Sequence, residues 1–291
     1  MKKVALITTI PAPYREKVYQ LVAQNGDFDF HVFYCNKIES NRKWVFTLGN
    51  YSKTFLDSKV MKIGSTYVHW NMGIFSKLKE YKPDVVITCG YSPIMLVSFL
   101  WAKLNNKKHI TFTDGTISSE GNLTFIHRFI RRFIFTRTAA FIGASKKSLS
   151  LYRSYGVSDD KLYLSCLAVD NTHFFKEINL PKKYDLMFSG QFIDRKMPIF
   201  FAEVAGQIKQ KRGQCNVLIL GSGPLEIDFL KALRLQGVEY HYPGFIQQNE
   251  LPVYYGSSIL FLFPSIYDAW GVVANEACAS GVPVITCENV G

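Results

Sequence analysis

Two carboxylates in the last part of the sequence are the residues best suited to do chemistry. Asp268 and Glu276 stand with seven residues between them. Asp268 follows the apolar run 259–263, which is typical of a buried parallel strand, and Glu276 lies in a predicted helix over residues 273–279. Where a strand turns into a helix, unpaired backbone N–H groups face an anionic ligand. The pattern therefore predicts a polar ligand whose hydroxyls are held by two acids.

The residues around this pair resemble the signature of the retaining glycosyltransferases of family four, which are nucleotide-sugar enzymes with the GT-B fold. That signature has two Glu residues separated by seven positions, and here Asp268 stands at the first and Glu276 at the second. Further matches flank the pair: Pro264-Ser265, Trp270-Gly271, Asn275-Glu276-Ala277 and Gly281-Val282-Pro283-Val284-Ile285. Two acids at such a junction also arise by chance, but these flanks favour function. The resemblance covers most of the chain and is densest after Tyr184.

The resemblance implies a role for each of these residues. Glu276 would hold the ribose hydroxyls of the nucleotide, and Asp268 would hold the donor sugar. Asp268 is one methylene shorter than the family's Glu, so the charge is kept but the reach is less. Backbone N–H groups that would bind the sugar and the phosphate belong to four consecutive residues: Ala269, Trp270, Gly271 and Val272.

A charged loop follows the first predicted strand of the second half, residues 184–189. It resembles the family's Gly-Arg-Leu…Lys-Gly loop, with Gly190 as the glycine and Lys196 at the Lys position. Gln191 stands where Arg is usual, and Arg195 is the neighbouring cation that replaces it. Fixed cations stabilise the charge that a departing nucleoside diphosphate gains, without a metal. The alternative is a solvated charge cluster in a loop.

Two more segments of the second half are candidates for binding the donor. Gly221 and Gly223 follow a predicted strand over residues 217–220, where a backbone without side chains approaches a ligand closely. An ordinary tight turn explains them nearly as well. Phe245 and Ile246 match the place where relatives bind the nucleobase through backbone groups, and a strand end with a turn is the alternative.

Two residues in the first half are candidates for the acceptor side. Arg15 ends the loop 9–15, which follows the first predicted strand, and it faces either the ligand cleft or solvent. Asp114 follows the predicted strand 109–113, where the tips of a sheet face the expected interdomain cleft. A carboxylate there would orient a sugar, or it would only cap the next turn.

The segment 123–135 has an amphipathic helical pattern. The apolar residues 126, 129, 130, 133 and 134 are predicted to pack on the sheet, and the basic residues are predicted to lie on the opposite face. These basic residues are His127, Arg128, Arg131 and Arg132. The basic face is either simply solvated or docks on an anionic membrane surface by electrostatic attraction.

The net charge of +11 is concentrated in the first half of the chain. Residues 1–180 carry 25 Lys and Arg against 13 Asp and Glu, whereas residues 181–291 carry 9 against 10. This asymmetry predicts two domains with different partners, and an anionic surface or substrate for the first. Because no recognition module for nucleic acid is visible, nucleic acid is not expected as a partner.

The scattered cysteines and the short apolar runs restrict the cellular setting. The six Cys residues show neither a CxxC pair nor metal-ligand spacing, which predicts a reducing compartment and hence the cytosol. The Asp-any-Asp motif of metal-dependent glycosyltransferases occurs only at Asp27 and Asp29, far from the other motifs, so no metal is expected. No apolar run is long enough to span a bilayer, and the residues after Met1 are typical of a first strand rather than a signal peptide.

Strands and helices alternate along the whole chain, which predicts an α/β fold with mostly parallel sheets. We expect the GT-B arrangement of two facing Rossmann-like domains. The predicted boundaries are residues 1–170 for an acceptor-binding domain, 171–183 for a linker, and 184–291 for a nucleotide-sugar-binding domain. Relatives continue beyond the equivalent of residue 291, so the second domain is expected to be incomplete.

Together these observations predict a metal-independent, cytoplasmic glycosyltransferase, peripheral at the inner face of the cell membrane. It would transfer a sugar, with retention, from a nucleotide-sugar donor to a saccharide or lipid-linked acceptor in cell-surface polysaccharide synthesis. A sugar-nucleotide epimerase is a less fitting alternative, because Trp270-Gly271 accompanies the acid pair. The alternative from another class is a non-catalytic nucleotide-sugar-binding fragment or inactive homologue, which the departures at Gln191 and Asp268 favour.

Overall fold

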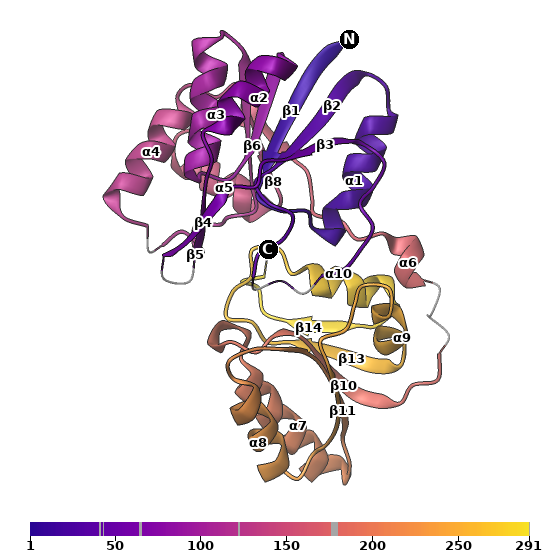
Figure 1. Cartoon of the computed structure of the whole chain (residues 1–291). Helices are drawn as coiled ribbons and strands as arrows, with labels where there is room; N and C mark the ends of the chain where they lie inside the picture. Colours follow the sequence, from indigo (N-terminus) through magenta and orange to yellow (C-terminus); the bar gives the residue numbers. More distant parts are fainter. Residues whose placement is uncertain (41, 43, 64–65, 122, 176–179, 291) are drawn as a thin grey trace. The chain divides into compact units, whose positions relative to one another are not determined.

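The chain forms two compact units, each built on its own parallel sheet (Figure 1). The computed structural model describes residues 1–290 except 41, 43, 64–65, 122 and 176–179. Unit 1 comprises Met1–Arg42 and Thr47–Leu167, and unit 2 comprises Lys43–Phe46 and Ala168–Gly291. Two Rossmann-like parallel sheets confirm the predicted α/β fold class.

Unit 1 contains a seven-stranded sheet and a two-stranded hairpin. The sheet strands are β1 (Lys2–Thr8), β2 (Phe28–Tyr34), β3 (Ser52–Phe55), β6 (Val85–Cys89), β7 (Lys108–Thr113), β8 (Ala140–Gly143) and β9 (Leu162–Leu164). All neighbouring pairs are parallel, in the order β3-β2-β1-β6-β7-β8-β9. The hairpin pairs β4 (Lys59–Ile63) with β5 (Thr66–Trp70). The helices are α1 (Pro13–Gln24), α2 (Gly73–Tyr81), α3 (Pro93–Leu104), α4 (Phe125–Phe135), α5 (Lys146–Ser154) and the 3-10 turn η1 (Asp159–Lys161).

Helices cover both faces of the sheet of unit 1. Because alternate residues of a strand point to opposite faces, β1 contributes Val4 and Leu6 to one core and Ala5 and Ile7 to another. The first core also contains Tyr19 of α1. The second contains buried residues of α2 and α3. This two-sided burial explains why the strands have nearly continuous apolar sequences.

Unit 2 is a five-stranded parallel sheet in the order β12-β11-β10-β13-β14. Its strands are β10 (Tyr184–Gln191), β11 (Asn216–Ser222), β12 (Glu239–Gly244), β13 (Ser258–Phe263) and β14 (Val284–Thr286). Its helices are α6 (Asn171–Phe175), α7 (Pro198–Arg212), α8 (Glu226–Leu235), α9 (Leu251–Gly256), α10 (Val272–Ala279) and the 3-10 turn η2 (Asp194–Lys196). Figure 1 shows α7 and α8 on one face of this sheet and α9 and α10 on the other. The strand order reverses between β10 and β13, which is where open α/β sheets bind ligands.

The first part of the predicted linker 171–183 is structured. Asn171–Phe175 form α6, and Phe174 is buried in the same core as Met187 of β10 and Tyr255 of α9. These five residues therefore belong to unit 2 rather than to an extended connection. Residues 176–179 of the predicted linker lie outside the described residues.

The prediction for the faces of α4 was wrong in part. Phe125, Ile126 and Phe129 are 81%, 67% and 63% exposed, whereas Arg131 is only 8% exposed. The buried positions of this helix are Arg131, Ile134 and Phe135. Apolar residues surround much of α4, so their spacing did not determine which side packs on the sheet. Of the apolar positions expected in the core, Ile134 is buried, but Ile126 and Phe129 face solvent.

Arg131 is buried because it has specific partners. Its Nη2 lies 2.8 Å from Glu120 Oε1, and its guanidinium lies over the ring of Tyr91, 4.4 Å from the centroid. An ion pair and a cation–π contact compensate the desolvation of a buried arginine. Arg131 is therefore a structural residue and is not available for the anionic membrane surface that the sequence suggested.

Replacing Gly221 with alanine is expected to destabilise unit 2 by about 3 kcal/mol or more. Gly221 has φ +123°, and a Cβ atom built on it would lie 1.9 Å from the carbonyl oxygen of Gly190 on the paired strand. Gly213→Ala is the matched control, because Gly213 also has positive φ (+84°) but has nothing within 4 Å of the built Cβ. That control is expected to cost about 1 kcal/mol. Urea unfolding of both variants checks the difference, and equal losses would contradict it.

Candidate functional site

The loops that follow β10 and β13 lie side by side at the point where the strand order of unit 2 reverses. The β10 loop contains η2, with Arg195 and Lys196, and the β13 loop contains Asp268. The backbone N–H of Ile266 donates to the carbonyl oxygen of Arg195 at 2.8 Å, which fixes the two loops to each other. Parallel strands with adjacent carboxyl ends thus bring together residues that are 72 positions apart.

Asp268 is the centre of a charged cluster formed by these two loops. Its Oδ2 atom lies 2.5 Å from Lys196 Nζ and 3.0 Å from Arg195 Nη1. Lys196 is buried, and its ammonium group lies 4.3 Å from the centroid of the Phe263 ring. Arg195 is about one-third exposed and also donates to the backbone oxygen of Tyr267 at 3.2 Å. Two cations therefore share one carboxylate.

The cluster carries one uncompensated positive charge. Burial alone would raise the pKa of Asp268, but Lys196 and Arg195 outweigh burial and hold that pKa below its usual value. Burial and the nearby Arg195 charge lower the pKa of Lys196, because Asp268 offsets the burial only in part. Both pKa values are therefore lowered, as expected where two cations share one anion that cannot neutralise both. A multiply charged anion is the kind of ligand that this imbalance favours.

The second oxygen of Asp268 organises the turn that leads into α10. Oδ1 accepts from the backbone N–H of Trp270 at 3.2 Å and of Gly271 at 2.8 Å. Two of the four N–H groups predicted to bind donor are therefore paired with Asp268. Gly271 precedes the helix, and a Cβ atom built on it would lie 2.9 Å from Phe263, so close packing requires glycine here.

Glu276 lies on α10 and is buried, with both oxygens paired. Oε1 accepts from Gln248 Nε2 at 3.1 Å, and Oε2 accepts from the Tyr255 hydroxyl at 3.0 Å. The same hydroxyl lies 3.0 Å from Ser189 Oγ at the end of β10. Burial raises the pKa of Glu276 to about 7, because the bonds from Gln248 and Tyr255 only partly compensate the desolvation. A carboxylate with a strongly shifted pKa at a strand-order reversal is typical of a functional site.

Sequence reasoning missed the partners of Glu276. Tyr255 is fully buried in a segment whose apolar composition predicts only core packing, and Gln248 lies in an ordinary polar loop. Neither residue type nor spacing marks them, since they reach Glu276 from a different helix and a different loop. Only the proximity of Phe245 and Ile246 in sequence could have drawn attention to Gln248.

The predicted glycines Gly190, Gly221 and Gly223 lie at the ends of β10 and β11. Gly190 and Gly221 are register partners in the sheet. A Cβ atom built on Gly223 would lie 2.6 Å from backbone atoms of Phe192. The close approach of neighbouring backbones therefore gives Gly221 and Gly223 a structural reason. Phe245 and Ile246 follow β12 and lead directly to Gln248, so they lie in the loop that contacts Glu276.

Arg15 and Asp114, the predicted acceptor-side residues, both lie in unit 1 near the carboxyl ends of β1 and β7. The Arg15 guanidinium lies over the ring of Phe112, 4.6 Å from the centroid. It also interacts electrostatically with the Asp114 carboxylate. The structure thus brings these two residues into one part of unit 1.

Among the described residues, no three His, Cys, Asp or Glu side chains gather closely enough to hold a metal ion. In that same part of the chain, no helix has both the length and the apolar character needed to cross a bilayer.

The comparisons with known proteins decide the family of the second unit. Residues 170–291 match the family model described as "Glycosyl transferases group 1". Residues 170–291 are a group 1 glycosyltransferase domain. This domain contains Asp268, Glu276, Lys196 and Arg195.

Individual relatives are similar over different shares of the chain. An "Uncharacterized 41.2 kDa protein in cps region" of Klebsiella pneumoniae is 23% identical over 91% of this chain and 75% of its own length. A 2-deoxystreptamine N-acetyl-D-glucosaminyltransferase of Niallia circulans is 30% identical over 38% of this chain. The chain spans only 28% of the length of that second relative. The first likeness thus extends over most of the chain, whereas the second covers little more than a third of it.

A solved structure shows the same fold over the whole chain. Anabaena Alr3699/HepE, determined in complex with UDP-glucose, has a TM-score of 0.69 and 14% sequence identity. The match covers 100% of this chain and 82% of that one. At this identity the likeness establishes the GT-B fold class rather than a shared substrate.

Proposed function

We propose that this glycosyltransferase transfers a sugar from a nucleotide-sugar donor to a saccharide or lipid-linked acceptor, with retention of the anomeric configuration and without a metal. The observation that carries the proposal is the cluster of Lys196, Arg195 and Asp268 at the strand-order reversal of the group 1 domain. Such a position suits the diphosphate of a nucleotide sugar, because fixed cations lie beside the carboxyl ends of the strands, where open α/β sheets bind ligands.

In the proposed reaction, Lys196 and Arg195 stabilise the diphosphate as the bond to the sugar breaks. That bond cleavage moves negative charge onto the leaving group, and cations held in place need no reorganisation at that moment. Both cations pair with Asp268 in the structure. When the diphosphate takes over the cations, the Asp268 carboxylate becomes available for a hydroxyl of the donor sugar.

Glu276 is proposed to accept hydrogen bonds from the ribose hydroxyls. It already accepts two neutral hydrogen bonds, from Gln248 and Tyr255, in a buried setting. Gln248 comes from the loop that contains Phe245 and Ile246, which are proposed to bind the nucleobase through backbone groups. A nucleoside that enters here displaces the Gln248 amide and replaces its bond with bonds from the ribose.

The proposed setting is cell-surface polysaccharide synthesis at the cytoplasmic face of the membrane. The Klebsiella relative described as a protein of a cps region supports this context. The excess of basic residues in the first 180 positions, 25 Lys and Arg against 13 Asp and Glu, suits an acceptor at an anionic surface. Arg15 and Asp114 are proposed to orient that acceptor.

A nucleotide panel in a thermal-shift experiment tests the donor site. Uridine, guanosine and adenosine diphosphates and their sugars are added to the wild type and to Glu276→Ala. We expect one base to raise the melting temperature of the wild type, because a ligand at a hundred times its Kd adds about 2.7 kcal/mol.

We expect the variant to lose most of that shift. Stabilisation without release of nucleoside diphosphate from the sugar nucleotide would instead favour the non-catalytic binding protein that Gln191, in place of the usual Arg, suggests. No shift with any nucleotide would contradict the proposed donor site.

A further inference from the structure

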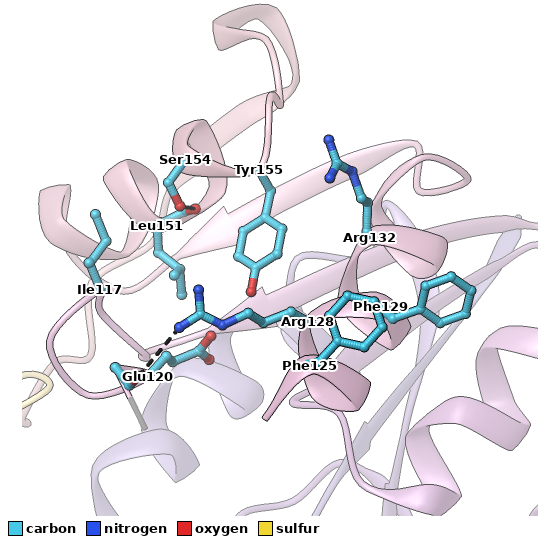
Figure 2. Close-up of a pocket in the computed structure, with 10 residues that line it drawn as sticks. Ile117, Glu120, Phe125, Arg128, Phe129, Arg132, Leu151, Ser154 and Tyr155 are labelled. Atoms are coloured by element: carbon cyan, nitrogen blue, oxygen red, sulfur yellow. Dashed lines mark hydrogen bonds between the residues drawn. The ribbon is translucent and has the colours of Figure 1, made fainter. Parts of the chain in front are cut away.

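A pocket in unit 1 lies between α4, the segment before it and α5, and has a volume of about 590 Å³. Figure 2 shows Arg128 extending into it toward Glu120, with Tyr155 and Leu151 on the other side. Arg132 also lines the pocket. None of these residues belongs to the proposed donor or acceptor machinery, so the pocket has no role in the reaction described above.

The pocket is positively charged. Glu120 is its acidic lining residue, and Arg131 neutralises it through the 2.8 Å ion pair. The Arg128 guanidinium makes only long bonds, of 3.4 Å, to the backbone oxygens of Leu123 and Gly121. Within the described part of the chain, the guanidinium of Arg132 makes no hydrogen bond or ion pair. Two arginine charges are thus left for an anionic ligand, and arginine forks match phosphate oxygens.

An apolar stripe borders these arginines on the same helix. It consists of Phe125, Ile126 and Phe129, which are 81%, 67% and 63% exposed, and Phe133, which is partly exposed. Phe125 and Phe129 also form part of the pocket wall (Figure 2). Three large apolar side chains in water cost free energy unless a partner covers them. A helix with this stripe and flanking arginines has the character of one that lies in a membrane interface.

We propose that this pocket binds the phosphate of an anionic membrane lipid while the apolar stripe of α4 inserts among the acyl chains. Arg128 and Arg132 hold the headgroup phosphate, and Phe125, Ile126 and Phe129 lie below it in the bilayer. The charge complementarity favours lipid over a second copy of the chain, because two surfaces with a large positive excess repel each other. This inference rests on the membrane setting of the proposed function. It adds insertion of apolar side chains to the purely electrostatic docking that the sequence suggested.

Vesicle co-sedimentation with matched variants tests this docking surface. Vesicles of phosphatidylcholine, with or without phosphatidylglycerol, are mixed with the full chain at low and raised salt. We expect Arg128→Gln/Arg132→Gln to weaken binding to the anionic vesicles by roughly thirtyfold, the equivalent of about 1 kcal/mol per arginine. We expect Phe125→Ser/Phe129→Ser to weaken it by roughly tenfold or more, including the binding that survives raised salt.

The control is Lys211→Gln/Arg212→Gln, which removes the same charge from exposed positions of α7 in unit 2. It is expected to bind vesicles as the wild type does. Equal binding to neutral and anionic vesicles, or equal losses in the control and the Arg128/Arg132 variant, would overturn the headgroup site. An unchanged Phe125/Phe129 variant would overturn the insertion and leave only electrostatic docking by the arginines. The nucleotide thermal shift of each variant separates failure here from failure of the donor site.

Discussion

Lys196→Ala is expected to lower kcat for release of nucleoside diphosphate from the sugar nucleotide by at least about a hundredfold. A fixed hydrogen-bond donor or cation that meets charge developing in the transition state is commonly worth a factor of a hundred to a thousand. Lys196 is the buried member of the pair of cations, and its Nζ lies 2.5 Å from the Asp268 oxygen that the diphosphate would replace. A buried cation acts in a lower dielectric than an exposed one. Steady-state assays of donor hydrolysis measure the effect.

The variant is expected to remain folded. Asp268 keeps its bonds from Arg195, Trp270 and Gly271 when Lys196 is removed. Its carboxylate is therefore not left unpaired, and we expect a loss of about 1–3 kcal/mol in unfolding free energy.

Arg195→Ala serves as the matched comparison, because Arg195 contacts the same oxygen but is about one-third exposed. Solvent screening should make its loss smaller. If Lys196→Ala kept the wild-type kcat and changed only KM, the proposed stabilisation of the departing diphosphate would be wrong.

Most strands of the two sheets and several helices could be predicted, because the local sequence determines them. The helix predicted over residues 273–279 coincides with α10 except for one residue at its start, since Gly281 follows its last turn. The strand predicted over residues 109–113 likewise lies within β7. The short hairpin of β4 and β5 was not predicted, because neither strand has the long apolar run of a strand buried on both faces.

The orientation of α4 could not be predicted, because it depends on residues outside the helix. Arg131 is buried only because Glu120 and Tyr91 lie where its guanidinium packs. A sequence pattern assigns arginine to the exposed side of a helix, since an unpaired buried charge costs too much. The partners that remove this cost come from other segments, so helical periodicity contains no signal for them.

In the candidate site, too, local sequence predicted some features, while others depend on contacts between distant segments. Asp268, Glu276, Arg195 and Lys196 were selected as candidates through motifs that are each confined to a short stretch of sequence. The structure adds that Lys196 and Asp268 pair directly, and that Glu276 is held by Tyr255 and Gln248. These contacts cross from one loop or helix to another, so only the folded sheet defines them.

The affinity for the nucleotide sugar is expected to fall by roughly tenfold between pH 8 and pH 6. Burial raises the pKa of Glu276 to about 7 in the free protein. The ribose hydroxyls donate to the carboxylate, so binding favours the ionised form and becomes linked to release of a proton below that pKa. Above about pH 7 the carboxylate is already ionised and the affinity should be constant. A sugar nucleotide is the right ligand, because a free diphosphate has a phosphate group that titrates near pH 6.

Glu276→Gln distinguishes this linkage from a general effect of pH. The amide keeps the shape of the side chain but does not titrate, so the weaker affinity of this variant should show no step near pH 7. The same substitution should stabilise the free protein at pH 8. A carboxyl whose pKa is raised on folding contributes stability at low pH that is lost as pH rises toward 7, and the buried charge then costs up to about 3 kcal/mol. Higher stability together with weaker binding would mark Glu276 as a residue retained for its ligand. An affinity that declines in the variant as it does in the wild type would assign the pH dependence to another group.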